Sequence, residues 1–163
     1  MPTASAGGTG PNRARSCTDA YRFAIERMRR GVSATGALHP NAVWERYATP
    51  SEWPSWAPQI RRVESAQDRL APGLTGRVHG LFGVTADFEV LAVDDALRTW
   101  SWRVRSGPAT LTLHHAVLEV AEGTQTTLEI EGPAVVVLPY APVAQVALRR
   151  LVRPSVTAPE PTP

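Results

Sequence analysis

The sequence predicts an α+β fold in which a long antiparallel sheet closes around one C-terminal helix. Three features, in chain order, lead to this prediction: a tryptophan-rich helical stretch over about 40–60, alternating apolar and polar positions over about 61–132, and an apolar helical face over about 140–152. A period of two is typical of half-buried strands, and a period of 3.6 is typical of helices. A sheet covered by a single helix leaves space between the two, so the sequence also predicts an interior cavity.

The bulk composition fits one globular domain. A chain of 163 residues has the length of a single domain, and its apolar fraction of 43% is sufficient for a core. We expect a flexible basic tail over residues 1–17, the folded domain over 18–153 and a flexible proline-rich tail over 154–163. No run approaches about 18 consecutive apolar residues, so we expect no stable membrane insertion, and the N-terminus lacks the apolar stretch of a secretory signal.

Two residue types are scarce or missing, and this excludes several kinds of site. The single cysteine, Cys17, excludes an internal disulfide and a cysteine-rich metal site, and it favours a cytoplasmic location. The chain has no lysine, so a Schiff-base lysine and a Walker-type phosphate lysine are both excluded.

The basic charge is concentrated near the N-terminus. Residues 11–31 carry six arginines against Asp19 and Glu26, a net of +4 in a chain whose total is +2, so the remainder carries −2. The predicted domain itself is therefore not basic, and we expect no nucleic-acid partner. Two interpretations of the arginine-rich segment remain open: a solvated tail, or an arm that docks on anionic lipid, nucleic acid or another partner.

The first predicted elements are a short segment with two interpretations and a strand. Within residues 18–30, Tyr21, Ile25 and Met28 would share one face of a short amphipathic helix. The alternative is one continuous strand from about Tyr21, because the apolar residues there also alternate. Residues 32–38 are predicted as the first strand in the helical interpretation.

Two short helices are predicted between the first and second strands. Pro40 suits the first turn of a helix, and one face of that helix is apolar, formed by Val43, Trp44, Tyr47 and Ala48. The sequence Thr49-Pro50 ends it. A second short helix or turn follows, and it carries Trp53 and Trp56.

Six strands and a helix complete the predicted domain. The strands are expected at about 60–66, 74–81, 84–93, 97–105, 109–120 and 124–132. Short turns rich in Gly, Pro and Asp separate them, so neighbours in sequence should pair antiparallel as a meander. Residues 133–139 are predicted as an apolar connector and 140–152 as the last helix, whose C-terminal arginines suit the negative end of the helix dipole.

Five blocks of the chain resemble a known superfamily: VWERYATPSEWPSWAPQIRRVE, LAPGLTGRV, FEVLAVDDALRTWSWRV, LHHAV and YAPVAQVALRRLV. They are similar to the START-like, or SRPBCC, superfamily, and within it to bacterial polyketide cyclase/dehydrase-like proteins. The resemblance covers about residues 31–152. It implies the helix-grip fold of the birch pollen allergen and of lipid-transfer START domains, in which a curved antiparallel sheet wraps a C-terminal helix and two short helices lie between the first two strands.

Strand alternation predicts which side chains face the cavity. The inward rows are Ala86, Phe88, Val90 and Ala92; Trp100, Trp102 and Val104; Leu111, Leu113, His115 and Val117; and Leu128 with Ile130. From these rows, the short helices and the last helix, the residues expected to bind a ligand are Trp56, Phe88, Val90, Trp100, Trp102, Leu113, His115 and Tyr140. The two indoles of Trp100 and Trp102 would either fill the interior or offer a stacking surface to a flat or long apolar ligand.

His115 is the candidate catalytic residue, with Tyr140 as its partner. An imidazole on an apolar row needs a hydrogen bond, so one interpretation is a structural histidine bonded to Tyr140 or to a backbone carbonyl. The other is a polar group of the cavity that orients a ligand or moves a proton, as the resemblance to cyclases implies.

Other kinds of site are not expected. His114 and His115 are adjacent on a strand and point to opposite faces, so they cannot ligate one metal, and no metal or cofactor is predicted. Binding of a small hydrophobic molecule, such as a lipid or polyketide, is therefore the predicted function, and a polyketide cyclase or aromatase that uses His115 is the alternative. The sequence does not identify the ligand or predict the oligomeric state.

Overall fold

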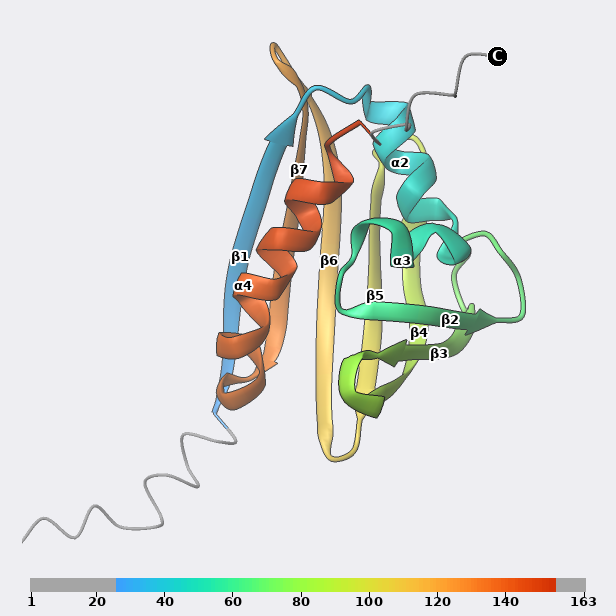
Figure 1. The fold of residues 1–163 in the computed structure, drawn as a ribbon, viewed down its shortest axis with the longest axis vertical. Helices are drawn as coiled ribbons and strands as arrows, with labels where there is room; N and C mark the ends of the chain where they lie inside the picture. Colours follow the sequence, from blue (N-terminus) through green and yellow to red (C-terminus); the bar gives the residue numbers. More distant parts are fainter. Residues whose placement is uncertain (1–25, 155–163) are drawn as a thin grey trace, which may run out of the picture.

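Residues 26–154 are described by the computed structural model, in which one sheet wraps a C-terminal helix (Figure 1). Its antiparallel strands lie in the order β1-β7-β6-β5-β4-β3-β2. They are β1 Arg27–Gly36, β2 Ile60–Ser65, β3 Thr75–Gly80, β4 Thr85–Asp94, β5 Thr99–Ser106, β6 Ala109–Val120 and β7 Gly123–Pro133. The helices are α2 Pro40–Ala48, η1 Pro50–Glu52, α3 Trp53–Trp56, η2 Leu81–Gly83 and α4 Ala134–Leu151.

The order of the strands confirms the predicted helix-grip architecture. Strands β2 to β7 form a meander in which each strand pairs with the next along the chain, as the short turns require. Strand β1 pairs with β7, from Arg27 opposite Pro133 to Gly36 opposite Thr124. Helix α4 packs on β1 and β7, and α2, η1 and α3 lie between β1 and β2 as predicted.

The helical interpretation of residues 18–30 is wrong where the structure describes them. Strand β1 begins at Arg27, and Arg27 and Arg29 extend from its outer face to ion pairs with Glu131 at 3.1 and 3.3 Å. Met28, on the other face, packs against the core. Pairing with β7 therefore decides the conformation here, and the part of this prediction that precedes residue 26 lies outside the described residues.

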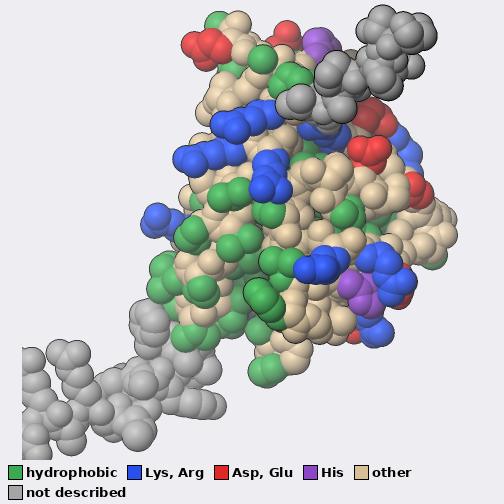
Figure 2. Space-filling model, in the orientation of Figure 1, with side chains coloured by type: hydrophobic (Ala, Val, Ile, Leu, Met, Phe, Trp, Pro, Cys, Tyr) green, Lys and Arg blue, Asp and Glu red, His purple; other side chains and the backbone are tan. Residues whose placement is uncertain are grey.

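Helix α4 begins at Ala134, so the prediction of an apolar connector before residue 140 is also wrong. Two prolines, Pro139 and Pro142, lie inside the helix, and neither can donate to the carbonyl four residues earlier. Those two carbonyls belong to Val135 and Leu138. Both residues lie on the exposed side of the helix, where water can replace the missing donors. Figure 2 shows apolar side chains exposed on this face of the molecule.

A bulge in β4 reverses part of one predicted inward row. Phe88 and Val90 are buried as predicted, but the pairing of β4 with β5 shifts between Val90 and Ala92. Beyond the bulge Val93 packs against the core and Ala92 is exposed, so the inward position predicted for Ala92 is wrong. The other rows face inward as predicted, with Leu111, Leu113, His115, Val117, Leu128 and Ile130 buried.

The two short helices are attached to the sheet through their tryptophans. Trp44 Nε1 donates to Asp95 Oδ1 in the β4–β5 turn at 2.9 Å, which ties α2 to the sheet. Trp53 Nε1 donates to the backbone carbonyl of Tyr47 at 2.9 Å, and Trp56 Nε1 to that of Arg46 at 3.3 Å. Each indole thus buries its ring and satisfies its N–H, which fixes α2 and α3 over the interior.

Candidate ligand-binding groove

A chain of hydrogen bonds runs through the interior from β5 to the backbone of β6. Trp102 Nε1 donates to His115 Nε2 at 3.1 Å, which leaves Nδ1 as the protonated nitrogen of a neutral imidazole. His115 Nδ1 lies 3.2 Å from the Tyr47 hydroxyl, and this hydroxyl lies 2.8 Å from Thr126 Oγ1. Thr126 Oγ1 donates to the carbonyl of Ala116 at 3.3 Å. Each polar side-chain atom in this chain therefore has a partner.

Burial holds His115 in its neutral form. Desolvation lowers the pKa of His115 from 6.5 to about 3, and the charge of the neighbouring His114 contributes in the same direction. Desolvation also raises the pKa of Tyr47 above its ordinary value, and the hydrogen bond with Thr126 partly opposes this shift. A neutral imidazole with both nitrogens bonded inside the protein has no free position for a ligand proton.

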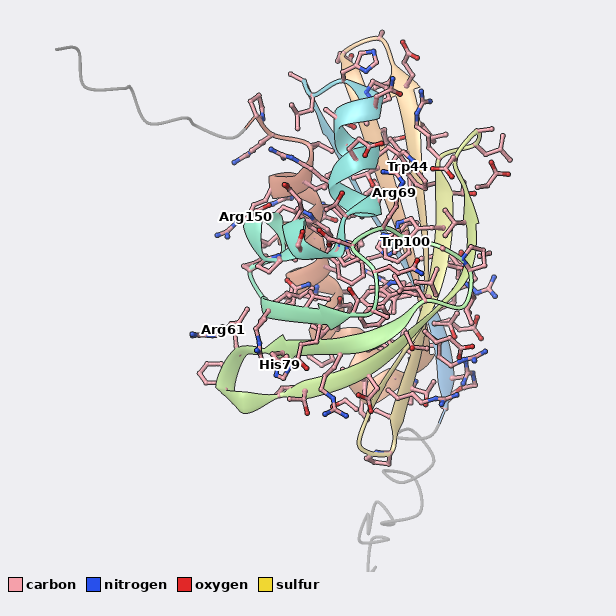
Figure 3. All side chains as sticks on the ribbon, turned by 90° about the vertical axis from the view of Figure 1, so that its right-hand side faces the viewer. Trp44, Arg61, Arg69, His79, Trp100 and Arg150 are labelled. Atoms are coloured by element: carbon pink, nitrogen blue, oxygen red, sulfur yellow. The ribbon has the colours of Figure 1, made fainter. Side chains whose placement is uncertain are left out.

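Aromatic rings fill most of the interior around this chain. The rings of Trp100 and His115 are stacked, with centroids 4.4 Å apart and planes inclined by 10°. Trp53 contacts Trp100 and Trp102 at centroid distances of 5.6 and 5.0 Å, and Phe88 contacts Trp102 at 5.7 Å. Figure 3 shows Trp100 between the sheet and the short helices. The indoles therefore pack against one another as a core.

A small cavity remains among these rings. Its volume is about 20 Å³, room for one water molecule, and its walls come from α3, β5, β6, β7, α4 and the segment before β2. The lining residues are Trp53, Trp56, Gln59, Ile60, Trp100, Trp102, His115, Leu128, Tyr140, Ala144, Ala147 and Leu148. Nε1 of Trp100, one of these residues, is buried and has no hydrogen-bond partner among the described residues.

A larger groove opens beside the cavity, between α4, η2 and the inner face of the sheet. Its volume is about 370 Å³, within the range of small-molecule sites, and its lining is almost wholly apolar. The lining residues are Gln59, Ile60, Val78, Gly80, Leu81, Phe82, Val84, Ala86, Trp102, Val104, Leu111, Leu113, Tyr140 and Val143.

Four side chains border both spaces: Gln59, Ile60, Trp102 and Tyr140. The indole N–H of Trp102 is bonded to His115, and the other two polar groups are the amide of Gln59 and the hydroxyl of Tyr140. Oε1 of Gln59 is buried and has no hydrogen-bond partner among the described residues. Burial raises the pKa of Tyr140, and a hydrogen bond with Gln59 partly opposes the shift. One side chain that borders both spaces thus carries a buried acceptor that no described protein group satisfies.

The predicted site residues fall into three groups. Trp102, Leu113 and Tyr140 line the groove, whereas Trp56, Trp100 and His115 border the small cavity, as do Trp102 and Tyr140. Phe88 and Val90 are buried in the core and line neither space.

Sequence reasoning missed Gln59 and the partners of His115. Gln59 lies in the turn between α3 and β2, where no periodicity indicates which way a side chain points. Tyr47 comes from α2 and Thr126 from β7, and only the packing of the two elements brings them to His115. An inward threonine on an otherwise apolar row is a signal that could have identified Thr126.

The outer face of the sheet carries two wider and more polar hollows. One, of about 600 Å³, is lined mainly by charged and small side chains of β2 to β5, including the ion pair of Arg77 with Asp87 at 2.7 Å. The other, of about 920 Å³, includes His114 and Glu129. Within residues 26–154 no group of three or more His, Cys, Asp or Glu side chains is placed to hold a metal ion.

Comparison with known proteins identifies the family. A sequence model of the family described as polyketide cyclase / dehydrase and lipid transport matches residues 31–158. The chain belongs to this family. The match confirms the superfamily to which the five sequence blocks pointed. No protein of curated function matches the chain.

Solved structures share the fold of this polyketide cyclase/dehydrase and lipid transport family member. The crystal structure of Ara h 8.0201 aligns with a TM-score of 0.63 at 13% identity, over 77% of this chain and 95% of that one. Ginseng major latex-like protein 151 from Panax ginseng aligns with a TM-score of 0.67, also at 13% identity and the same coverage. At this identity the similarity establishes the fold alone.

Proposed function

We propose that the protein binds one small hydrophobic ligand in the groove between the sheet and α4. The observation that carries the proposal is the 370 Å³ apolar groove, one of whose lining residues, Gln59, has a buried acceptor without a partner, Oε1. Apolar walls with a few placed polar groups are the usual composition of a small-molecule site. The family description, which includes lipid transport, agrees with this assignment.

The unpaired acceptor of Gln59 favours a ligand with one hydrogen-bond donor. A buried acceptor without a partner costs free energy, and a ligand hydroxyl that donates to Gln59 would remove this cost. The remaining walls of the groove offer only apolar contacts and the tip of Tyr140. The ligand class proposed is therefore an apolar molecule with a single hydroxyl group at one end, since a carboxylic acid is ionised at neutral pH and cannot donate.

The geometry favours binding over a cyclase reaction at His115. Both ring nitrogens of His115 are engaged by Trp102 and Tyr47, and its low pKa keeps it neutral at physiological pH. General acid–base catalysis requires a group that can exchange a proton with the substrate within hydrogen-bond reach. His115 does not line the groove, so its role in the proposal is to position Trp102, whose indole forms part of the groove wall.

Filling the groove tests the proposal. Ala86 lines the groove on β4, and Ala86→Phe should occupy much of its volume and lower ligand affinity by about tenfold or more. Affinity is measured by fluorescence titration with anilinonaphthalene sulfonate and with panels of fatty acids and aromatic polyketides. Native mass spectrometry of the purified protein identifies any molecule that co-purifies.

Ala92→Phe is the matched control. Ala92 lies on the same strand, but the bulge exposes it on the outer face, so the same substitution there should leave affinity unchanged. If Ala86→Phe binds the probes as well as the wild type, or if both variants lose binding equally, the ligand does not occupy this groove and the proposal is wrong.

A further inference from the structure

Between residues 135 and 146 the outer side of α4 is mostly apolar. Val135, Leu138, Val143 and Val146 are between 37% and 47% exposed, and Pro139 and Pro142 are exposed between them. The helix contains no acidic residue. Among the described residues α4 is also the single helix long and apolar enough to cross a membrane, although its other side packs on the sheet. A helix that is apolar all round is typical of an apolar environment on both sides.

A second apolar element lies next to α4. Phe82, in η2, is 99% exposed and adopts a left-handed conformation with φ of 56°, which is uncommon for a residue other than glycine. Val84 beside it is 56% exposed. Phe82 and Val143 both line the groove, so the apolar surfaces of η2 and α4 border the same space. We call this combined surface, from α4 residues 135–146 to η2, the apolar face.

Unpaired arginines border the apolar face. Arg149, Arg150 and Arg153 follow it at the C-terminal end of α4, and Arg61 lies on β2. Within residues 26–154 none of these four arginines takes part in an ion pair. Two of them line a hollow of about 220 Å³ whose walls contain no carboxylate: Arg46, Ser55, Arg150, Arg153 and Pro154.

The figures place these groups on one side of the molecule. Figure 3 shows Arg61 and Arg150 pointing to the same side, toward which the loop between β3 and β4 also projects. In Figure 2 this side carries green and blue side chains over α4, whereas red side chains are confined to the top and the right-hand part of the view. Apolar and cationic side chains therefore share one face.

We propose that the apolar face docks on the surface of an anionic phospholipid bilayer. Phe82 and the outer valines and prolines of α4 would enter the interface, while Arg61, Arg149, Arg150 and Arg153 meet lipid phosphates. Charge decides between this occupant and a second copy of the chain. In a symmetric dimer through the same face, the arginines of each chain would find no acidic partner on the α4 of the other chain, because α4 contains no acidic residue.

Docking in this orientation has a consequence for the groove. Phe82 and Val143, both exposed on the apolar face, line it, so the groove would open onto the bilayer. A hydrophobic ligand could then pass between lipid and protein without crossing water. This inference does not depend on the identity of the ligand.

Vesicle flotation with the full chain tests the inference. Binding to vesicles of phosphatidylcholine mixed with phosphatidylglycerol should exceed binding to phosphatidylcholine alone, and high salt should weaken it. Replacing Arg149 and Arg150 together by glutamine should lower binding to the anionic vesicles by about 25-fold, since each arginine contributes about fivefold. Phe82→Asn should lower binding to both kinds of vesicle by about tenfold, and asparagine tolerates the left-handed conformation.

Leu97→Asn is the matched control, because Leu97 is 68% exposed in the β4–β5 turn and outside the apolar face. It should bind like the wild type, and circular dichroism checks that each variant is folded. Absence of flotation with both vesicles would overturn the proposal, as would equal loss in Phe82→Asn and Leu97→Asn. A dimer detected by analytical ultracentrifugation that Phe82→Asn dissociates would assign the apolar face to a second copy instead.

Discussion

At the scale of single residues, the hydrogen bonds and ring contacts of His115 determine how the interior packs. Its two nitrogens bond to Trp102 and Tyr47, and its ring is stacked on Trp100. The sequence predicted an inward histidine with a hydrogen-bond partner, but named Tyr140 or a backbone carbonyl as that partner. The true partner on α2 could not be predicted, because helical periodicity places Tyr47 on an apolar face without showing which strand residue it meets.

The free energy of unfolding should decrease as the pH falls from about 7 to about 5. The pKa of His115 is about 3 in the folded protein against 6.5 for an ordinary histidine, so between these values the unfolded chain binds a proton that the folded protein does not. The free energy of unfolding is therefore unaffected by His115 above pH 6.5. Below pH 6.5, protonation of His115 in the unfolded chain lowers it by about 1.4 kcal/mol per pH unit. Urea denaturation at the two pH values should differ by about 2 kcal/mol.

Two neighbouring substitutions serve as controls for the pH dependence. His115→Asn should reduce the difference between the two pH values, because the group that titrates in the unfolded chain is removed. His114→Gln, on the exposed face of the same strand, should retain most of it. Equal wild-type stability at both pH values would show that the imidazole is not held neutral in the folded protein.

Gln59 should decide selectivity for the polar end of the ligand. Gln59→Leu removes the unpaired Oε1 and also the hydrogen bond to Tyr140, so stability should change little. Affinity for a ligand with a terminal hydroxyl should fall about tenfold, while affinity for the same molecule without the hydroxyl stays the same. Fluorescence titration with the two matched ligands measures this, and an equal loss for both would contradict a hydrogen bond to Gln59.

At the scale of elements, strand positions were predicted to within a few residues, whereas three local features were not. The bulge after Val90 and the start of β1 at Arg27 depend on cross-strand pairing, which a pattern along one strand does not contain. The start of α4 depends on tertiary burial: Val137 and Ala141 pack on the sheet, and this burial outweighs the helix-breaking tendency of Pro139 and Pro142. Proline in the sequence led to the prediction of a connector.

The contact between β1 and the end of α4 should be sensitive to a single methyl group. A Cβ at Gly36 would collide with the carbonyl oxygen and the side chain of Val152, directly after α4. Gly36→Ala should therefore lower the free energy of unfolding by about 1–3 kcal/mol, as overpacking does elsewhere. Chemical denaturation measures the change.

Gly31→Ala, on the same strand, is the control for this substitution. No atom lies within 4 Å of a Cβ at Gly31, so alanine there should be neutral or stabilising. If both alanine variants lose the same stability, the strand is sensitive to substitution in general and the contact with Val152 is not the cause.

At the scale of the whole molecule, the sequence predicted the architecture but not the space inside it. Whether Trp100 and Trp102 would fill the interior or line a cavity was left open, since the volume depends on how rings from α3, β4 and β5 pack together. In the structure the two indoles fill most of the interior and leave a cavity of about 20 Å³. The larger space is the groove, which lies beside them and next to α4 and η2. A change in the rotamers of a few side chains alters such a cavity volume, and the hydrophobic pattern of the sequence does not predict rotamers.

The pairing of β1 with β7 also fixes the order in which the molecule can assemble. Strands β2 to β7 join through short turns, so each hairpin can form soon after its residues emerge during synthesis. Arg27, however, pairs with Pro133, and α4, which follows Pro133, packs across both strands. Closing so long a loop carries a larger entropic cost and comes late in folding. The groove therefore acquires the wall formed by α4 only after all seven strands of the sheet have been made.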